Sequence, residues 1–269
     1  MIADSQVERW FREDVGHHDV TNDLPGETTG RLVAKESGTV AGLDAAAAVF
    51  SYLDVPVVDR RENGESVEAG DRVLRVDGPT RDVLRAERVA VNLAGHASGI
   101  ATRTREAVDA ARTESDDVAV AGTRKTTPGL RGIEKRAIAA GGGDTHRLTL
   151  SHMVMVKDNQ IAESGLETAV KRAGERASFA TKIEVEVESL EAGRQAADYG
   201  ADIVLFDNLP PNAVRSGVET LPESVLAEAS GGIALTDVPA YARTGVDVIS
   251  LGSLTHSAPA LNLSFRTGE

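Results

Sequence analysis

The chain has 269 residues, of which 41% are hydrophobic and 26% are charged, so a sizeable core can form and disorder is not expected. A formal net charge of −13 argues against nucleic acid and anionic membranes as partners. The absence of cysteine excludes disulfides, thiolate nucleophiles, Cys-ligated zinc and iron–sulfur clusters.

Nothing in the sequence indicates a membrane or an export signal. No apolar run reaches the roughly 18 residues that a membrane span needs. The first residues, Met-Ile-Ala-Asp, lack the basic start and apolar stretch of a signal peptide. We therefore expect a soluble, cytoplasmic protein. The acidic excess, with only 6 Lys against 23 Arg, also suggests a salt-loving protein that loses its fold at low salt.

The first hundred residues combine strand-like and helical patterns. Residues 28–42 and 64–80 are short alternating runs punctuated by Gly, which is typical of antiparallel strands joined by tight turns. Residues 43–53 and 81–112 carry apolar side chains near helical spacing. These patterns predict a small layer of strands and helices that ends in a long helix.

From about residue 117 the pattern changes to strand, loop and helix in repetition. Helical stretches such as 163–177, 189–199 and 236–244 separate the apolar runs. The runs are 118–121, 153–156, 183–187, 203–206, 225–227 and 246–251. Alternating strands and helices predict a parallel sheet, here a compact (β/α) barrel that need not be fully closed.

Charged, Gly or Ser residues follow each of these predicted strands. Active sites of (β/α) barrels are built where the strands end, so these residues are candidates for a site. They are Thr123-Arg124-Lys125, Lys157-Asp158-Asn159, Glu186, Asp207-Asn208, Ser230-Gly231-Gly232 and Gly252-Ser253.

Cationic side chains gather between residues 124 and 157 of this acidic chain. Arg124, Lys125 and Lys157 lie at predicted strand ends, where we expect them to attract an anionic substrate. His146 and Arg147 follow the glycine-rich residues 141–143, which permit close approach of the backbone to a ligand. Lys135 and Arg136 are expected to be solvated charges on a helix.

Carboxylates and glycines at the later strand ends predict two further functions. In residues 182–188 the glutamates alternate with Ile and Val, so the glutamates should face the barrel interior. Glu186 and Asp207 could hold Mg²⁺, or they could form salt bridges with Lys125 or Lys157. Phosphate is often bound by Gly-rich loops after late barrel strands, here Ser230–Gly232 and Gly252–Ser253.

Taken together, these motifs resemble one family along nearly the whole chain. The most specific stretches are Thr123–Arg131 (TRKTTPGLR), Gly141–Gly143 followed by His146-Arg147, and Lys157-Asp158-Asn159. The chain is similar to quinolinate phosphoribosyltransferases, also called nicotinate-nucleotide pyrophosphorylases (carboxylating). The resemblance implies an α/β fold with an N-terminal α/β sandwich, residues 1–102, to which residues 259–269 return. It also implies an incompletely closed α/β barrel over residues 103–258.

The resemblance further implies a reaction and a set of binding residues. Quinolinate and phosphoribosyl pyrophosphate would give nicotinate mononucleotide, pyrophosphate and CO₂ with Mg²⁺, in de novo NAD synthesis. The residues that would hold the quinolinate carboxylates are Arg88, Arg124, His146, Arg147 and Lys157, with Lys125 and Lys157 near the reacting centre. Thr123 would be a further substrate-binding residue. Those that would hold the ribose hydroxyls and Mg²⁺ are Glu186 and Asp207. Those that would hold the 5′-phosphate are Ser230, Gly231, Gly232, Leu251, Gly252 and Ser253, with His256 nearby.

Family members are homo-oligomers, dimers or hexamers, which implies that Arg88 completes the site of a neighbouring subunit. Two positions depart from the family pattern. Gly122 stands where many relatives have Asp, which removes a carboxylate that could support Arg124, and Gln160 stands where many have His. Two alternatives stay open: a paralogue of the same fold linked to molybdenum uptake, and a Schiff-base aldolase that uses Lys157.

Overall fold

The computed structural model describes residues 2–268, which form two compact units. Unit 1 comprises the residues up to Arg105, Gly132–Gly142 and the residues from Ala258 onward, whereas unit 2 comprises Glu106–Arg131 and Gly143–Ser257. Residues 132–142 therefore group with unit 1, although the sequence placed them inside the barrel segment 103–258. Within residues 2–268, no helix combines the length and the apolarity that a membrane crossing requires.

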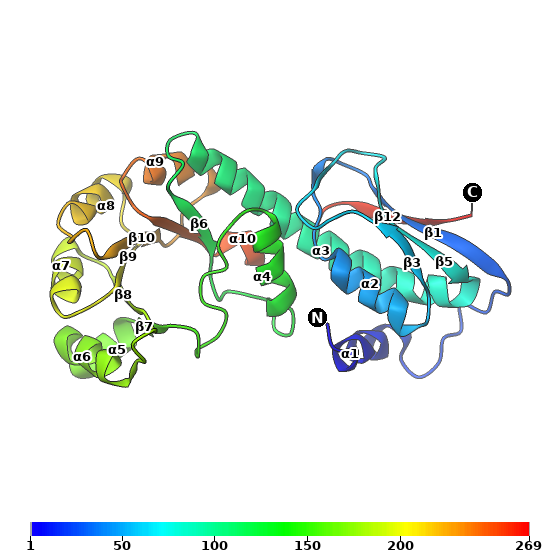
Figure 1. Ribbon diagram of the computed structural model, residues 1–269, viewed down its shortest axis with the longest axis horizontal. Helices are drawn as coiled ribbons and strands as arrows, with labels where there is room; N and C mark the ends of the chain where they lie inside the picture. The colour runs from blue at the N-terminus through cyan, green and yellow to red at the C-terminus, as the bar shows by residue number, and fades with distance from the viewer. Residues whose placement is uncertain (1, 269) are drawn as a thin grey trace. The chain divides into compact units, whose positions relative to one another are not determined.

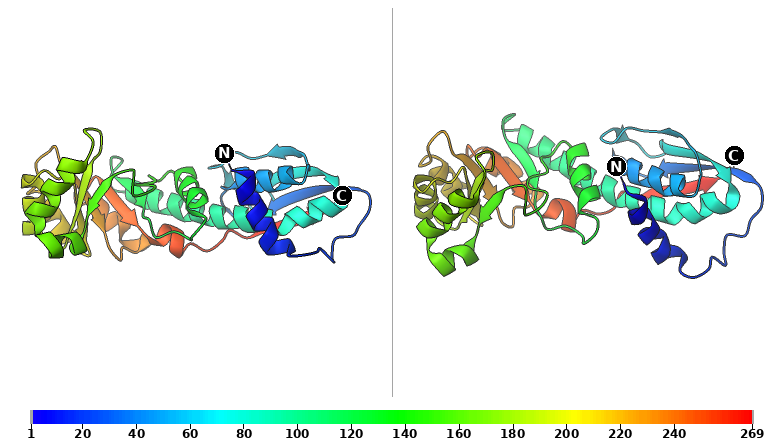
Figure 2. Two further views of the ribbon diagram at one scale, coloured as in Figure 1. Left: turned by 90° about the horizontal axis from the view of Figure 1, so that it is seen from below. Right: turned by 60° about the horizontal axis from the view of Figure 1, so that its bottom comes forward.

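An antiparallel sheet with the order β12-β1-β5-β3 forms the centre of unit 1 (Figure 1). Its strands are β1 (Glu27–Ala34), β3 (Val57–Arg60), β5 (Arg72–Pro79) and β12 (Leu263–Thr267), and a short ribbon pairs β2 (Gly38–Thr39) with β4 (Ser66–Val67). Figure 2 shows β12 in red beside β1 in blue, and Ala34 pairs with Leu263. The C-terminal end of the chain thus adds a strand to the first sheet.

The helices of unit 1 supply its core. They are α1 (Asp4–Val15), α2 (Leu43–Tyr52), α3 (Thr80–Arg112), which continues into unit 2, and α4 (Arg131–Ala140). Phe50 of α2 stacks on Phe265 of β12 with ring centroids 5.7 Å apart. On α3, a Cβ at Gly99 would lie 1.9 Å from the carbonyl oxygen of Pro259, so only Gly lets the returning chain pass so closely.

The prediction of a solvated Lys135 was wrong. Lys135 is only 2% exposed, and its neighbour Glu134 is fully buried. His96 of α3 lies with Nε2 2.9 Å from Glu134 Oε1, so α4 packs its charged residues toward α3. Arg136 does face outward, with 46% of its side chain exposed beside Asp44.

Unit 2 contains six parallel strands in the order β6-β11-β10-β9-β8-β7. The strands are β6 (Ala119–Gly122), β7 (Val154–Val156), β8 (Ile183–Val187), β9 (Ile203–Asp207), β10 (Leu226–Ser230) and β11 (Val248–Leu251). Strands β6 and β7 stand at the two ends of this order, so the barrel is incompletely closed. This architecture confirms the predicted α/β fold.

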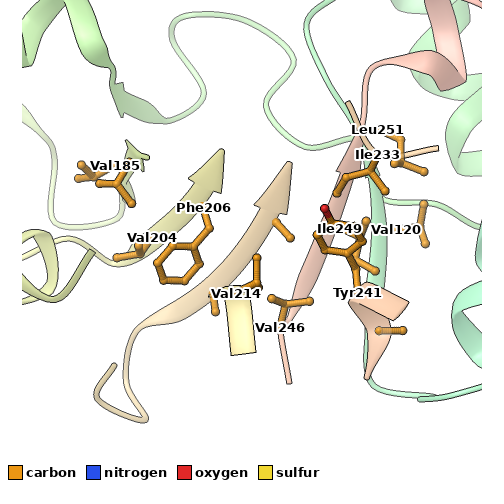
Figure 3. Close-up of a cluster of buried hydrophobic side chains, with 14 of the residues drawn as sticks. Val120, Val185, Val204, Phe206, Val214, Ile233, Tyr241, Val246, Ile249 and Leu251 are labelled. Carbon is orange, nitrogen blue, oxygen red and sulfur yellow. The ribbon is translucent and has the colours of Figure 1, made fainter. Parts of the chain in front are cut away.

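Helices cover the outer face of these strands (Figure 1). They are α5 (Asp158–Ser164), α6 (Leu166–Arg176), α7 (Leu190–Asp198), α8 (Pro211–Val218), α9 (Val238–Ala242) and α10 (Ser253–His256), with the 3₁₀ turn η1 (Leu235–Asp237) before α9. Val185, Val204, Phe206 and Ile249 lie in the buried cluster between the sheet and its helices (Figure 3). Because side chains alternate along a strand, the residues between them face the barrel interior.

Candidate active site

The carboxyl ends of the parallel strands bring the predicted site residues of unit 2 to one edge of the sheet. Ser230 at the end of β10 is in register with Asp207 at the end of β9. One layer below, Leu205 of β9 is in register with Glu186 of β8 on one side and with Glu228 of β10 on the other. This register arranges the inward-facing side chains in two layers, with Ser230 and Asp207 nearer the strand ends and Glu186, Leu205 and Glu228 below them.

Lys157, Glu186 and Asp207 form a charged group at this edge. The Lys157 ammonium forms an ion pair with Glu186 Oε2, as the salt-bridge alternative foresaw. Burial raises the pKa of Asp207, and the Glu186 charge raises it further, whereas Lys157 and Lys125 oppose this rise. Gln160, one of the two departures from the family pattern, accepts a hydrogen bond from the Lys157 backbone N–H at 3.0 Å and so caps α5.

His146 lies between two buried glutamates. Its Nε2 atom is 3.2 Å from Glu228 Oε2 and 3.4 Å from Glu184 Oε2. Its backbone adopts a left-handed conformation with φ of 50°, and its N–H donates to Asp144 Oδ1 at 2.5 Å. The sequence analysis did not single out Glu228. A lone Glu between two Ala residues, two positions before Ser230, was the available signal, because it shares the inward parity of Ser230.

Two arginines bring buried positive charge to the same interior. Arg147 is 8% exposed, and burial lowers its pKa, as does the Arg124 charge, whereas Glu184, Glu186 and Glu228 raise it. Its Nη2 atom lies 2.6 Å from the Met155 thioether, a weak acceptor. The buried Nε of Arg124 has no hydrogen-bond partner among the described residues. A bound carboxylate would satisfy such donors.

Glycines shape the loops after β10 and β11. Gly231 and Gly232 have φ of 89° and 61°, and a Cβ at Gly231 would lie 2.5 Å from the Asn208 backbone nitrogen. A Cβ at Gly252 would lie 3.1 Å from Lys125 Cδ and 3.2 Å from His256 Nε2. Gly231 therefore cannot carry a side chain, and a side chain at Gly252 would require Lys125 and His256 to shift. Loops with so little side-chain cover can offer backbone N–H groups to an anion.

The remaining predicted substrate-binding residues differ in which of their atoms could contact a ligand. Thr123 Oγ1 accepts a hydrogen bond from the Lys125 N–H at 3.1 Å and shapes that loop. Ser253 is half-buried at the start of α10. The Leu251 side chain packs in the outer core, so only its backbone can face a ligand. Arg88 belongs to unit 1, where it lies on α3 with 60% of its side chain exposed and 3.5 Å from Glu87.

Comparison with known proteins agrees with this geometry. The family model described as quinolinate phosphoribosyl transferase, C-terminal domain, matches residues 100–266, and the N-terminal domain model matches residues 18–98. The chain belongs to the quinolinate phosphoribosyltransferase family. The domain models cover both the sheet of unit 1 and the barrel of unit 2.

Individual relatives match over nearly their whole lengths. The chain is 41% identical to the probable nicotinate-nucleotide pyrophosphorylase (carboxylating) of Methanothermobacter thermautotrophicus, covering 96% of each chain. It is also 41% identical to the nicotinate-nucleotide pyrophosphorylase (carboxylating) of Homo sapiens, with 97% of this chain and 90% of the human protein covered. The solved nicotinate-nucleotide pyrophosphorylase of Francisella tularensis superposes with a TM-score of 0.93 at 30% identity, covering 100% and 98% of the two chains.

Within this family fold, the donor set of Glu186 and Asp207 suits a hard divalent cation. Both offer carboxylate oxygens, the ligands that Mg²⁺ prefers, from neighbouring strands. The Glu186 charge raises the pKa of Asp207, so the two carboxylates repel each other, and a cation would relieve that repulsion. The residues present therefore fit a Mg²⁺ ion.

The buried Glu184 gives the family fold a pH-dependent stability that can be measured. Burial, together with the Glu228 charge, raises the pKa of Glu184 from 4.5 to about 8. The folded chain therefore holds a proton that the unfolded chain has lost, and its stability falls as pH rises from about 4.5 to about 8. Glu184→Gln cannot titrate, so we expect its melting temperature to exceed that of the wild type by at least ~3 °C more at pH 8.5 than at pH 5. Thermal unfolding at the two pH values checks this, and an equal difference at both would contradict it.

Proposed function

We propose that this chain transfers a phosphoribosyl group from phosphoribosyl pyrophosphate to quinolinate and releases CO₂, giving nicotinate mononucleotide and pyrophosphate in NAD biosynthesis. One observation supports this above all. Arg124, Arg147 and Lys157 converge on the interior edge where Glu186 lies near the end of β8 and Asp207 ends β9. A dicarboxylate, a ribose and a phosphate are complementary to this combination of groups.

Recognition of quinolinate follows from the cations. Its two carboxylates would take the bidentate donors of Arg124 and Arg147, with His146 beside them. The glycine loops at Gly231 and Gly252 would receive the 5′-phosphate of the second substrate through backbone N–H groups, with Lys125 and His256 close by. The two anionic substrates would therefore bind side by side despite the acidic net charge of the chain.

The chemistry would proceed between these two subsites. Glu186 and Asp207 would hold the ribose hydroxyls and stabilise the positive charge that develops at the ribose carbon. Mg²⁺ held by the same carboxylates would supply charge neutralisation for pyrophosphate. The pyridine nitrogen attacks the ribose carbon as the bond to pyrophosphate breaks. The new pyridinium then accepts the electron pair left when the 2-carboxylate departs as CO₂, and a proton takes its place on the ring.

The ion pair of Lys157 argues against the aldolase alternative. A Schiff base requires a neutral amine, and nucleophilic lysines are usually activated by an apolar pocket or by a neighbouring cation. Lys157 instead pairs with the carboxylate of Glu186, which is neither an apolar pocket nor a neighbouring cation. None of the relatives described above supports the molybdenum-linked alternative.

Product formation tests the proposed function. Purified protein incubated with quinolinate, phosphoribosyl pyrophosphate and Mg²⁺ should form nicotinate mononucleotide, detected by mass spectrometry. Nicotinate, which lacks the second carboxylate, should not replace quinolinate, and a chelator should stop the reaction. The assay should span low to molar salt because the acidic composition suggests a salt-loving protein. Absence of product at every salt concentration would defeat the proposal.

We also propose that the active site is shared between two copies of the chain. Arg88 is exposed on α3 of unit 1, whereas the other predicted quinolinate ligands belong to unit 2. An isologous dimer could bring Arg88 of each copy to the barrel of the other. A dimer or a larger assembly built from such pairs is therefore expected.

A further inference from the structure

Two glutamates lie beneath the cations, and the mechanism described above does not use them. Glu184 of β8 and Glu228 of β10 are 0% and 1% exposed. Both face the barrel interior, because their neighbours Val185, Ala227 and Ala229 lie in the outer core. Two buried carboxylates beneath an anion-binding site need an explanation. Burying a carboxylate costs free energy unless a cation or a hydrogen-bond donor is paired with it.

The two carboxylates lie beside the imidazole ring of His146, whose backbone is also hydrogen-bonded. One ligand atom from each of His146, Glu184 and Glu228 lies within 4.8 Å of the other two. Both oxygens of Glu184 and Oε1 of Glu228 have no hydrogen-bond partner among the described residues. At the other end, the left-handed backbone of His146 is fixed through its N–H to Asp144. Asp144 therefore fixes the backbone of His146, and Glu228 fixes its imidazole ring.

The cations around Glu184 and Glu228 indicate that these glutamates compensate positive charge and do not bind a metal ion. The positive charges of His146, Arg147 and Lys157 act on Glu184, and Arg147 also interacts with Glu228. A divalent cation placed between His146, Glu184 and Glu228 would be repelled by the buried Arg147 guanidinium. Without the glutamates, in turn, the same cations would repel one another in a poorly solvated interior. The two glutamates thus lie beside the cations, and the Glu228 charge compensates the buried Arg147.

We propose that Glu228, assisted by Glu184, is a positioning residue that acts through His146: the carboxylates hold the imidazole ring in the orientation in which it meets a quinolinate carboxylate. This inference rests on the proposed function, because it assigns a role in recognising that substrate. Glu228 itself touches neither the substrate nor the reacting atoms. Its substitution should therefore alter quinolinate affinity and leave the phosphoribosyl donor and the chemical step nearly unaffected.

Glu228→Gln is the decisive variant because it keeps the shape and one acceptor but removes the charge. A charge-assisted hydrogen bond is worth roughly 1.4 kcal/mol more than a neutral one, so the Kd and KM for quinolinate should rise about tenfold. We expect kcat and the KM for phosphoribosyl pyrophosphate to stay within about threefold. In a His146→Ala background the same substitution should change quinolinate binding by less than about twofold, since its effect passes through the ring. Glu175→Gln, on the exposed surface of α6, is the matched control.

Calorimetric titration with quinolinate and steady-state kinetics on the full chain separate the outcomes. If the wild type binds and turns over quinolinate but Glu228→Gln matches it, the inference is overturned and the proposed function stands. An undiminished loss in the His146→Ala background also overturns it. A wild type that neither binds nor converts quinolinate overturns both. Should Glu228→Gln fail to fold, Glu184→Gln provides the same test when it is assayed at about pH 9, where Glu184 of the wild type has lost its proton, with the same tenfold weakening expected.

Discussion

Lys157→Ala is expected to lower kcat/KM for quinolinate by at least about 10³-fold while the chain remains folded. Lys157 directly follows β7, and its ammonium is paired with Glu186. In the proposed mechanism, removing it would take away a cation that contacts the substrate carboxylates. It would also leave the Glu186 charge uncompensated beside Asp207, where the proposed mechanism places the ribose and Mg²⁺.

The fold should tolerate this change because 40% of the Lys157 side chain is exposed. Lys171→Ala is the matched control, since Lys171 pairs with Glu167 on the surface of α6 and has no role in the site. Steady-state rates and thermal melts of the two variants would be compared with those of the wild type. Near-normal activity of Lys157→Ala, or equal losses in both variants, would remove Lys157 from the active site.

Mixing two inactive variants should restore activity if the site is shared between subunits. Arg88→Ala and Lys157→Ala should each lose nearly all turnover. After subunit exchange, half of the dimers contain one copy of each variant, and one of their two sites then combines an intact Arg88 with an intact Lys157. About a quarter of wild-type activity is therefore expected. The rate is measured after co-refolding or long co-incubation of equal amounts.

A second mixture controls for nonspecific recovery. Lys157→Ala combined with Glu186→Gln should stay inactive, because both residues lie in unit 2 and neither barrel of a mixed dimer is intact. No recovery in the first mixture, or substantial activity of Arg88→Ala alone, would contradict a shared site.

Local periodicity was sufficient to predict the barrel and much of its interior. The alternation between Ile183 and Val187 predicted inward glutamates, and Glu184 is fully buried while Val185 lies in the outer core. The strand ends Lys157, Glu186 and Asp207 were identified because charged residues directly follow apolar runs. The register of the parallel strands then brings their ends to one edge of the sheet.

Features of the fold that depend on contacts between distant parts of the chain could not be predicted from local sequence patterns. β12 is short, and its partner β1 lies more than 200 residues earlier, so no local pattern links them. The grouping of α4 with unit 1, and with it the burial of Lys135, depends on which helix it packs against. Glu228 was overlooked because a single Glu in an Ala-rich strand has little periodicity to mark it.

The most direct test of the central claim follows the carboxyl carbon that the reaction removes. Quinolinate labelled in the 2-carboxylate would be incubated with the protein, Mg²⁺ and phosphoribosyl pyrophosphate, and labelled CO₂ and nicotinate mononucleotide would be measured together. The proposed reaction predicts equal amounts of the two products and no labelled CO₂ when phosphoribosyl pyrophosphate is omitted. Labelled CO₂ without the donor, or a nucleotide product that retains the label, would contradict it.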